Sequence, residues 1–204
     1  MFRFLGKLLL LLLAAAITAA AAVLISSNDR LYTVADWMSM GRFHRYDAMI
    51  ADAAAKNGVD PLLLKAIVWR ESEFHPGKAG TSGERGLMQV SEAAASDWVR
   101  AHKVETFKPS DLFSPRMNLE IGSWYFKQAL TRWAKKDDPV PFALAEYNAG
   151  RTRVDLWIAQ TKLGADTTAA DLRTHIGFPS TQAYVETILK RRAFYEAEAK
   201  RGRK

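Results

Sequence analysis

Helix start and stop signals recur along this chain and constrain its fold more than any other feature. The stretch "RYDAMIADAAAKNG" has apolar residues at helical spacing and ends in Asn57-Gly58, a typical helix C-cap. Asp60-Pro61 follows and supplies an N-cap and a first-turn proline for the next helix, and Ser114-Pro115 starts a longer one. No stretch shows sustained apolar/polar alternation between hairpin turns. The sequence therefore predicts an all-α domain.

The N-terminus carries an uncharged apolar run from Leu8 to Ile25, preceded by Arg3 and Lys7. A membrane span needs roughly 17–25 such residues, whereas the core of a signal peptide has roughly 7–15. The run therefore favours an uncleaved signal-anchor, but the Ala19–Ala22 cluster leaves a cleaved signal peptide open. In either case the rest of the chain is expected outside the cytoplasm, because basic residues before the run favour a cytoplasmic N-terminus.

These signals divide the chain into four expected parts. They are a signal-anchor or signal peptide (1–25), a spacer (26–45), one folded domain (46–195) and a basic tail (196–204). The net charge of +7 is concentrated near the C-terminus. We interpret that cluster as a solvated helix end, or else as an attraction to an acidic polymer or an anionic membrane face. Export argues against nucleic acid as a partner.

Glu71 stands where an apolar residue is expected. It follows Leu64, Ile67 and Val68 at helical spacing, so it lies on the face turned to the core. Burial and the nearby helix C-terminus should both raise its pKa, which suits a general acid. The alternative is a boundary Glu that reaches solvent or pairs with an Arg. The helix should end near residues 74–75, because Pro76 disfavours helical geometry just before it.

Other kinds of site are not supported. The loop "GTSGERG" lacks the Lys-Ser/Thr of a P-loop and follows no strand. The four His residues are scattered, and the chain has no Cys, so we expect no metal, no thiol chemistry and no cofactor.

Four motifs in order resemble one family. Glu71-Ser72, "GLMQ" at 86–89, "AEYNAG" at 145–150 and "STQAYV" at 180–185, with "DLFSPRMNLEIGSWYF" at 111–126, resemble the lytic transglycosylases. The resemblance is to the soluble-lytic-transglycosylase-like domain with its goose-lysozyme-like helical fold, and it covers roughly residues 45–195.

The resemblance implies a lysozyme-like catalytic domain that acts on peptidoglycan glycan strands. Glu71 would be the sole catalytic acid/base, cutting between N-acetylmuramic acid and N-acetylglucosamine and leaving a 1,6-anhydro end without using water. Gln89 would hydrogen-bond the acetamido group or sugar hydroxyls, and Met88 would pack against a sugar. Tyr147 and Asn148 would line the site, and Tyr184 would place its hydroxyl near Glu71 or the acetamido group. Ser72 would orient the helix end.

The sequence departs from the family pattern at several positions. Gly80 stands where the family usually has Ser, Glu84 where it has Ala, and Ser180-Thr181-Gln182 where it has Glu-Thr-Arg. Two alternatives therefore stay open. One is a hydrolytic muramidase on the same fold, with Glu84 or Glu146 activating water. The other is a non-catalytic peptidoglycan-binding protein of the envelope, which the intact Glu71 and Gln89 disfavour.

Overall fold

The computed structural model describes residues 2–27 and 29–201. Within these residues there is no β-strand, and the only β-type pairing is two isolated bridges, Ala79 with Arg85 and Arg85 with Val90. The predicted all-α fold class is confirmed. The chain divides into two compact units, Met1–Phe43 and His44–Lys204, a division two residues before the predicted domain boundary.

The first unit contains two helices, α1 (Phe2–Ser26) and α2 (Arg30–Met38). Residues Gly6–Ile25 of α1 are apolar and solvent-exposed, and by length and composition they could cross a membrane. Helix α2 lies in the segment predicted to be a spacer, and the Asp29 carboxylate caps it by accepting the Tyr32 N–H at 2.9 Å. Much of that spacer is therefore helical.

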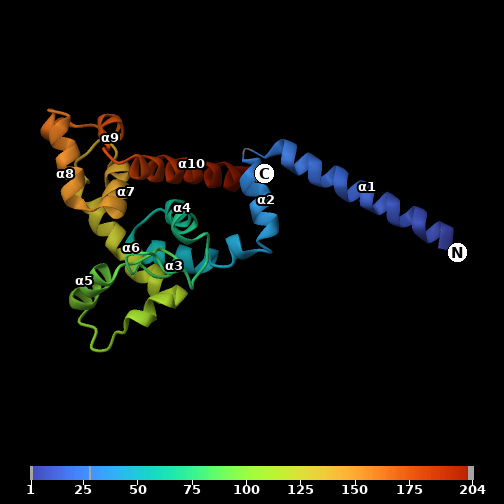
Figure 1. The fold of residues 1–204 in the computed structure, drawn as a ribbon, viewed down its shortest axis with the longest axis horizontal. Helices are drawn as coiled ribbons and strands as arrows, with labels where there is room; N and C mark the ends of the chain where they lie inside the picture. Colours follow the sequence, from blue (N-terminus) through green and yellow to red (C-terminus); the bar gives the residue numbers. More distant parts are fainter. Residues whose placement is uncertain (1, 28, 202–204) are drawn as a thin grey trace. The chain divides into compact units, whose positions relative to one another are not determined.

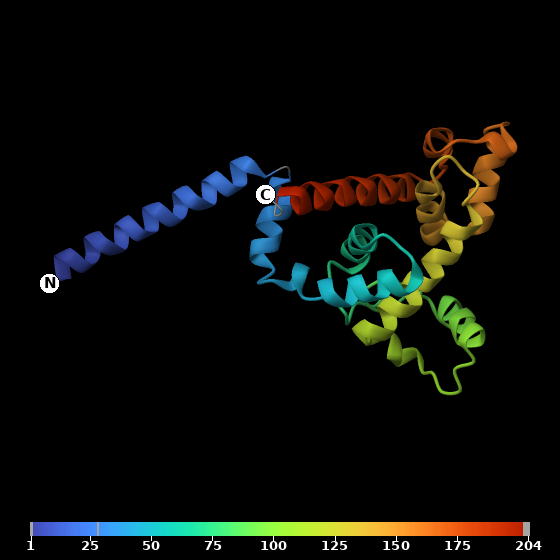
Figure 2. The same cartoon turned by 180° about the vertical axis from the view of Figure 1, so that it is seen from behind.

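The second unit contains the other eight α-helices of the described chain. They are α3 (Asp47–Asn57), α4 (Pro61–Ser72), α5 (Glu92–His102), α6 (Pro115–Arg132), α7 (Pro139–Ala149), α8 (Arg151–Gln160), α9 (Ala169–His175) and α10 (Pro179–Arg201). Three short 3₁₀ turns lie at Arg42–His44, Pro109–Phe113 and Gly164–Asp166. Helix α6 packs on α3, α5 and α7, while α4 packs on α3 and α10 (Figures 1 and 2). The ends of α4 and α7 thereby come close to the start of α10.

The helix boundaries follow the signals in the sequence with one instructive difference. Asp60 caps α4 by accepting the Leu62 N–H at 2.8 Å, and Gly58 ends α3 in the left-handed conformation (φ 61°), both as predicted. Helix α4, however, ends at Ser72, before the predicted 74–75. Glu73 (φ 49°) and Phe74 (φ 62°) turn left-handed, which carries the Phe74 ring into the core, where it is fully buried. Burial of an aromatic ring thus ends this helix before Pro76 does.

The basic C-terminal segment is more structured than the sequence suggested. Helix α10 continues to Arg201, so residues 196–201 belong to a helix, and residues 202–204 of the predicted tail lie outside the described residues. Arg191 is buried with its guanidinium 4.1 Å from the centroid of the Trp69 ring, and Arg192 pairs with Asp60 at 2.7 Å. Part of the charge cluster therefore packs α10 against α4 and is not a solvated helix end.

Candidate active site

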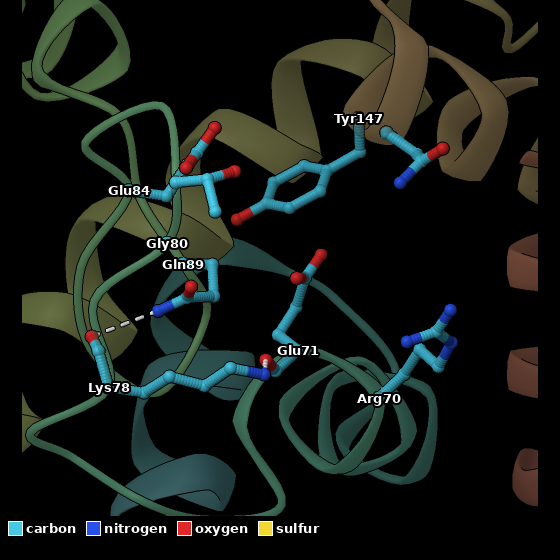
Figure 3. A pocket seen from close by; sticks show the side chains of 9 residues that line it. Arg70, Glu71, Lys78, Gly80, Glu84, Gln89 and Tyr147 are labelled. Atoms are coloured by element: carbon cyan, nitrogen blue, oxygen red, sulfur yellow. Dashed lines mark hydrogen bonds between the residues drawn. The ribbon is translucent and has the colours of Figure 1, made fainter. Parts of the chain in front are cut away.

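A polar pocket of about 260 Å³ opens where the C-terminal ends of α4 and α7 meet the loop between α4 and α5. Side chains from these three parts of the chain point into it (Figure 3). The pocket is lined by Arg70, Glu71, Lys78, Gly80, Thr81, Glu84, Gln89, Tyr147 and Asn148. Four of the six residues predicted to form the site thus line one pocket; the exceptions are Met88 and Tyr184.

Glu71 lies in the last turn of α4, on the face that carries the fully buried Ile67 and Val68. Burial raises the pKa of its carboxyl from the ordinary value of 4.5 to about 7. A hydrogen bond from Tyr184 and the positive charges of Arg70 and Lys78 act in the opposite direction but are outweighed. The predicted upward shift of this pKa is therefore confirmed, and Glu71 can either give or take a proton near neutrality.

Two tyrosines hold the site from opposite helices. Tyr184 of α10 is buried and donates its hydroxyl to Oε1 of Glu71 at 2.6 Å, which places it beside the carboxyl as predicted. Tyr147 of α7 donates to the backbone oxygen of Met88 at 2.9 Å. Burial, followed by the nearby Glu71 charge, raises the pKa of both phenols well above 10, so both remain hydrogen-bond donors. Glu71 is thus positioned by a neutral donor.

Gln89 presents its amide oxygen to the pocket and keeps its amide nitrogen for the loop. The nitrogen donates to the backbone oxygens of Lys78 at 3.1 Å and Gly86 at 3.0 Å (the former dashed in Figure 3). The backbone of Gln89 is left-handed (φ 47°), a conformation that non-glycine residues adopt rarely and often at functional sites. An acceptor such as this oxygen suits a substrate N–H or hydroxyl.

The loop that carries Gln89 is fixed from beneath by Asn118 of α6. This buried side chain accepts the Met88 N–H at 2.7 Å and donates to the backbone oxygens of Arg85 at 2.7 Å and Leu112 at 2.8 Å. Ser72 assists from α4, because its hydroxyl lies 2.8 Å from the Leu87 oxygen. Asn118 was not singled out from the sequence, although a polar residue in line with Gly122 and Phe126, at four-residue spacing, was a usable signal.

Met88 does not contact the pocket, which corrects the expectation that its side chain packs against a sugar. The side chain is fully buried against α6, where a Cβ added at Gly122 would lie 2.6 Å from its sulfur. The contribution of Met88 is its backbone, which bonds to Asn118 and Tyr147. The adaptable thioether thus fills the core beneath the loop.

The two other carboxylates considered from the sequence, Glu84 and Glu146, differ in whether they reach the pocket. Glu146 is buried, pairs with Arg132 and accepts the Trp133 indole N–H at 2.7 Å, so it faces away from the pocket. Glu84 does line the pocket. Arg85, next to Glu84 in the chain, pairs with Glu92 at 2.7 Å. No group of three or more potential metal ligands is found in the part of the chain that the structure describes.

Comparison with known proteins identifies the family to which this fold and pocket belong. Residues 48–169 match the transglycosylase SLT domain. The chain belongs to this family. It is 30% identical over 131 residues to the soluble lytic murein transglycosylase of Salmonella typhimurium, covering 64% of this chain and 20% of that protein. It is 29% identical over 136 residues to the membrane-bound lytic murein transglycosylase F of Desulfosudis oleivorans, covering 60% and 28%.

The fold of this SLT-family chain agrees with solved structures. The lytic transglycosylase Slt of Pseudomonas aeruginosa, solved as an inactive mutant, superposes with a TM-score of 0.69 at 23% identity, covering 80% of this chain and 26% of that one. The chain spans between a fifth and a third of the length of these relatives. The predicted fold class and family resemblance are both confirmed.

The departures from the family pattern fall in two places. Gly80 and Glu84 line the pocket itself. Ser180 and Gln182 are exposed at the start of α10 and do not line the pocket. Between them, the buried Thr181 donates its hydroxyl to the Asn148 side-chain oxygen at 2.7 Å and so orients that residue. This positioning contact was not foreseen from the sequence.

Proposed function

We propose that this protein is a peptidoglycan lytic transglycosylase. It cleaves the β-1,4 bond between N-acetylmuramic acid and N-acetylglucosamine and leaves a 1,6-anhydro-muramoyl end. The observation that carries the proposal is a single carboxyl, Glu71, whose pKa is raised to about 7 at the end of a polar pocket and which accepts a hydrogen bond from a neutral tyrosine. Membership of the SLT family and the names of its relatives, lytic murein transglycosylases, support it.

The first step needs an acid. Protonated Glu71 gives its proton to the bridging oxygen, and the bond from that oxygen to C1 of the muramoyl sugar breaks. The leaving N-acetylglucosamine departs with a hydroxyl, and the acetamido oxygen of the muramoyl sugar bonds to C1 in its place, so that the acetamido group takes up the positive charge. The amide oxygen of Gln89 can accept from the acetamido N–H and hold it in place. Glu71 is then a carboxylate.

The second step needs a base. The Glu71 carboxylate takes the proton of the C6 hydroxyl of the muramoyl sugar, and O6 bonds to C1, which closes the 1,6-anhydro ring and releases the acetamido oxygen. Glu71 ends protonated, as it began, so no water is consumed. A pKa near 7 suits both directions of transfer, because neither the acid nor the base form is strongly disfavoured at neutral pH.

Hydrolysis is the second candidate, because Glu84 lines the same pocket as Glu71 and could activate water. The two reactions differ in their products: transglycosylation gives anhydro ends, and hydrolysis gives reducing ends heavier by one water. Glu146, the other carboxylate considered for this role, is engaged by Arg132 and Trp133 and does not reach the pocket. A non-catalytic binding protein would have no need of a buried carboxyl with a raised pKa.

Digestion of purified sacculi, with mass spectrometry of the released muropeptides, tests the proposal. We expect anhydro ends from the wild type and a loss of about 10²–10⁴-fold in the Glu71→Gln variant, the range typical of general acid–base catalysis. Glu73→Gln is the matched control, because Glu73 is exposed two residues away and does not line the pocket. Reducing ends would favour hydrolysis, and an active Glu71→Gln variant would refute the proposal.

The proposed location is the bacterial envelope. Helix α1 would anchor the chain in the inner membrane through Leu8–Ile25, and the second unit would lie on the periplasmic side, where peptidoglycan is found. The apolar exposed stretch of α1 and the membrane-bound relative support this location. A cleaved signal peptide is the alternative.

A further inference from the structure

The pocket holds a second carboxylate, Glu84, which enters it from the tip of the loop between α4 and α5. The backbone of that tip is fixed: the Gly80 N–H donates to the Glu84 carbonyl at 2.7 Å, and the Arg85 and Val90 backbones exchange hydrogen bonds at 3.0 Å. The carboxylate of Glu84 accepts the Ser82 N–H at 3.1 Å. Among the described residues no cationic side chain forms an ion pair with it.

Gly80 provides the space that this carboxylate occupies. A Cβ placed on Gly80 would overlap Oε2 of Glu84, lie 3.2 Å from the Glu84 Cβ and lie 3.0 Å from the amide oxygen of Gln89. The overlapped atom is the far end of a flexible side chain, so a larger residue at position 80 would displace the carboxylate and not the backbone. The glycine at 80 and the glutamate at 84 are therefore one linked feature of this chain.

We infer that Glu84 is a positioning residue for the proton of Glu71: its negative charge, held in the pocket by the absence of a side chain at Gly80, adds to burial in favouring the protonated form of Glu71. The two carboxyl groups come from different parts of the chain and face the same pocket (Figure 3). A like charge disfavours ionisation of its neighbour, and the effect is greater in a partly desolvated site.

Every charged or titratable group that faces Glu71 bears on this inference. Tyr184 from α10 donates to its carboxylate, and Arg70 on α4 and Lys78 on the loop are positive, so all three lower the Glu71 pKa. Tyr147 from α7 is neutral and has its hydroxyl committed to Met88. Glu84 is thus the one charged side chain of the described pocket that acts together with burial to raise that pKa.

The consequence for catalysis rests on the proposed function. Before the reaction, Glu84 extends the pH range in which Glu71 holds the proton that the bridging oxygen needs. After the transfer, two negative charges face the same pocket, and their repulsion is relieved when Glu71 takes the proton from the C6 hydroxyl. Glu84 therefore favours the acid form in the first step and strengthens the base in the second, without contacting the reacting atoms.

Titration of Glu71 in the full-length protein in detergent micelles tests the inference without any need for activity. Glutamate labelled with ¹³C at the side-chain carboxyl is observed by NMR, and the Glu71 signal is assigned by its loss in Glu71→Gln. We expect Glu84→Gln to lower the titration midpoint of Glu71. Gly80→Ala keeps both carboxylates and should also lower this midpoint, because it displaces the Glu84 carboxylate.

Two matched controls separate charge from structure. Glu105→Gln removes one negative charge from an exposed loop that does not line the pocket. Gly77→Ala adds a methyl group in the same loop as Gly80, where a Cβ has nothing within 4 Å. Both controls should leave the Glu71 midpoint where it is. An unchanged midpoint in Glu84→Gln would overturn the inference, and an unchanged midpoint in Gly80→Ala alone would overturn the part assigned to Gly80.

The activity profile gives a second reading. The rate of each protein above pH 8 is expressed as a fraction of its own maximal rate. This fraction should be about two- to fivefold smaller for Glu84→Gln than for the wild type, because the activity of the variant begins to fall at a lower pH. A limb that moves to higher pH would contradict the inference. A wild type without activity on sacculi would refute the proposed function alone, since the titration still decides the relation between the two carboxylates.

Discussion

Replacement of Glu71 by Gln should stabilise the protein in a pH-dependent manner, even as it abolishes the proposed activity. Burial raises the Glu71 pKa from 4.5 to about 7, so the folded protein holds a proton that the unfolded chain releases between these values. Stability conferred by this group is therefore complete below pH 4.5 and is lost as the pH rises to 7. This is the reverse of the usual carboxylate, whose depressed pKa favours folding at neutral pH.

The magnitude follows from the pKa difference. A difference of 7 − 4.5, or about 2.5, corresponds to about 3.4 kcal/mol at 1.36 kcal/mol for each pH unit. Integrated over pH, the penalty is about 0.8 kcal/mol at pH 5 and about 3.3 kcal/mol at pH 8. The amide of Gln has the same shape, can still accept from Tyr184 and cannot ionise. The free energy of unfolding of Glu71→Gln, relative to that of the wild type, should therefore rise by about 2.5 kcal/mol between pH 5 and pH 8.

Urea unfolding of the wild type and Glu71→Gln at both pH values measures this gain, using chains that begin at Ser27 so that α1 does not interfere. Titration of the groups remote from Glu71 cancels in the comparison, and Glu105→Gln should differ from the wild type equally at both values. If the free-energy difference between wild type and Glu71→Gln is the same at pH 5 and pH 8, the reasoning that burial keeps Glu71 protonated is wrong.

Three further expectations can be checked independently. Asn118→Ala leaves the buried Met88 N–H and the Leu112 carbonyl without this partner and removes one of the two hydrogen bonds of the Arg85 carbonyl, which keeps the Val90 N–H. The free energy of unfolding in urea should fall by about 3–5 kcal/mol, and a loss below about 1 kcal/mol would show that the loop does not depend on Asn118. Tyr184→Phe removes a hydrogen bond that lowers the Glu71 pKa, so the alkaline limb of the activity profile should move to higher pH, and movement to lower pH would contradict the assigned contact. An uncleaved anchor predicts that N-terminal sequencing of the membrane fraction begins at Met1, whereas a soluble form beginning near Ala22 would reveal a signal peptide.

The parts of the fold and site that could be read from the sequence are those that depend on neighbours in the chain. Caps at Gly58 and Asp60 are local, and so is the helical spacing that placed Glu71 toward the core. The raised pKa was predicted from that placement together with the nearby helix C-terminus, and desolvation by burial is its largest cause. Local rules therefore sufficed to single out the carboxyl whose pKa is raised to about 7.

What could not be read depends on contacts between distant segments. The side chain of Met88 was expected to contact a sugar at the site. It is instead buried in the core, because Gly122 of α6 leaves space for it there. Asn118 and Thr181 act on residues about 30 positions away, which no periodicity reveals. Glu146 was considered from the sequence as a residue that activates water, but in the structure it pairs with Arg132 of another helix.

Asn118 and Ser72 hold one part of the loop between α4 and α5, and this has a consequence for how the protein can evolve. Both side chains secure the part of the loop from Arg85 to Met88, whereas Thr81, Ser82 and Gly83 at its tip are exposed. Mutations at the tip can thus alter the charge facing Glu71 while the backbone bonds of the anchored part persist. Adaptation to more acidic or more alkaline surroundings is easiest at this tip, because a new side chain there changes the electrostatics of the pocket with little effect on the hydrogen bonds that hold the rest of the loop.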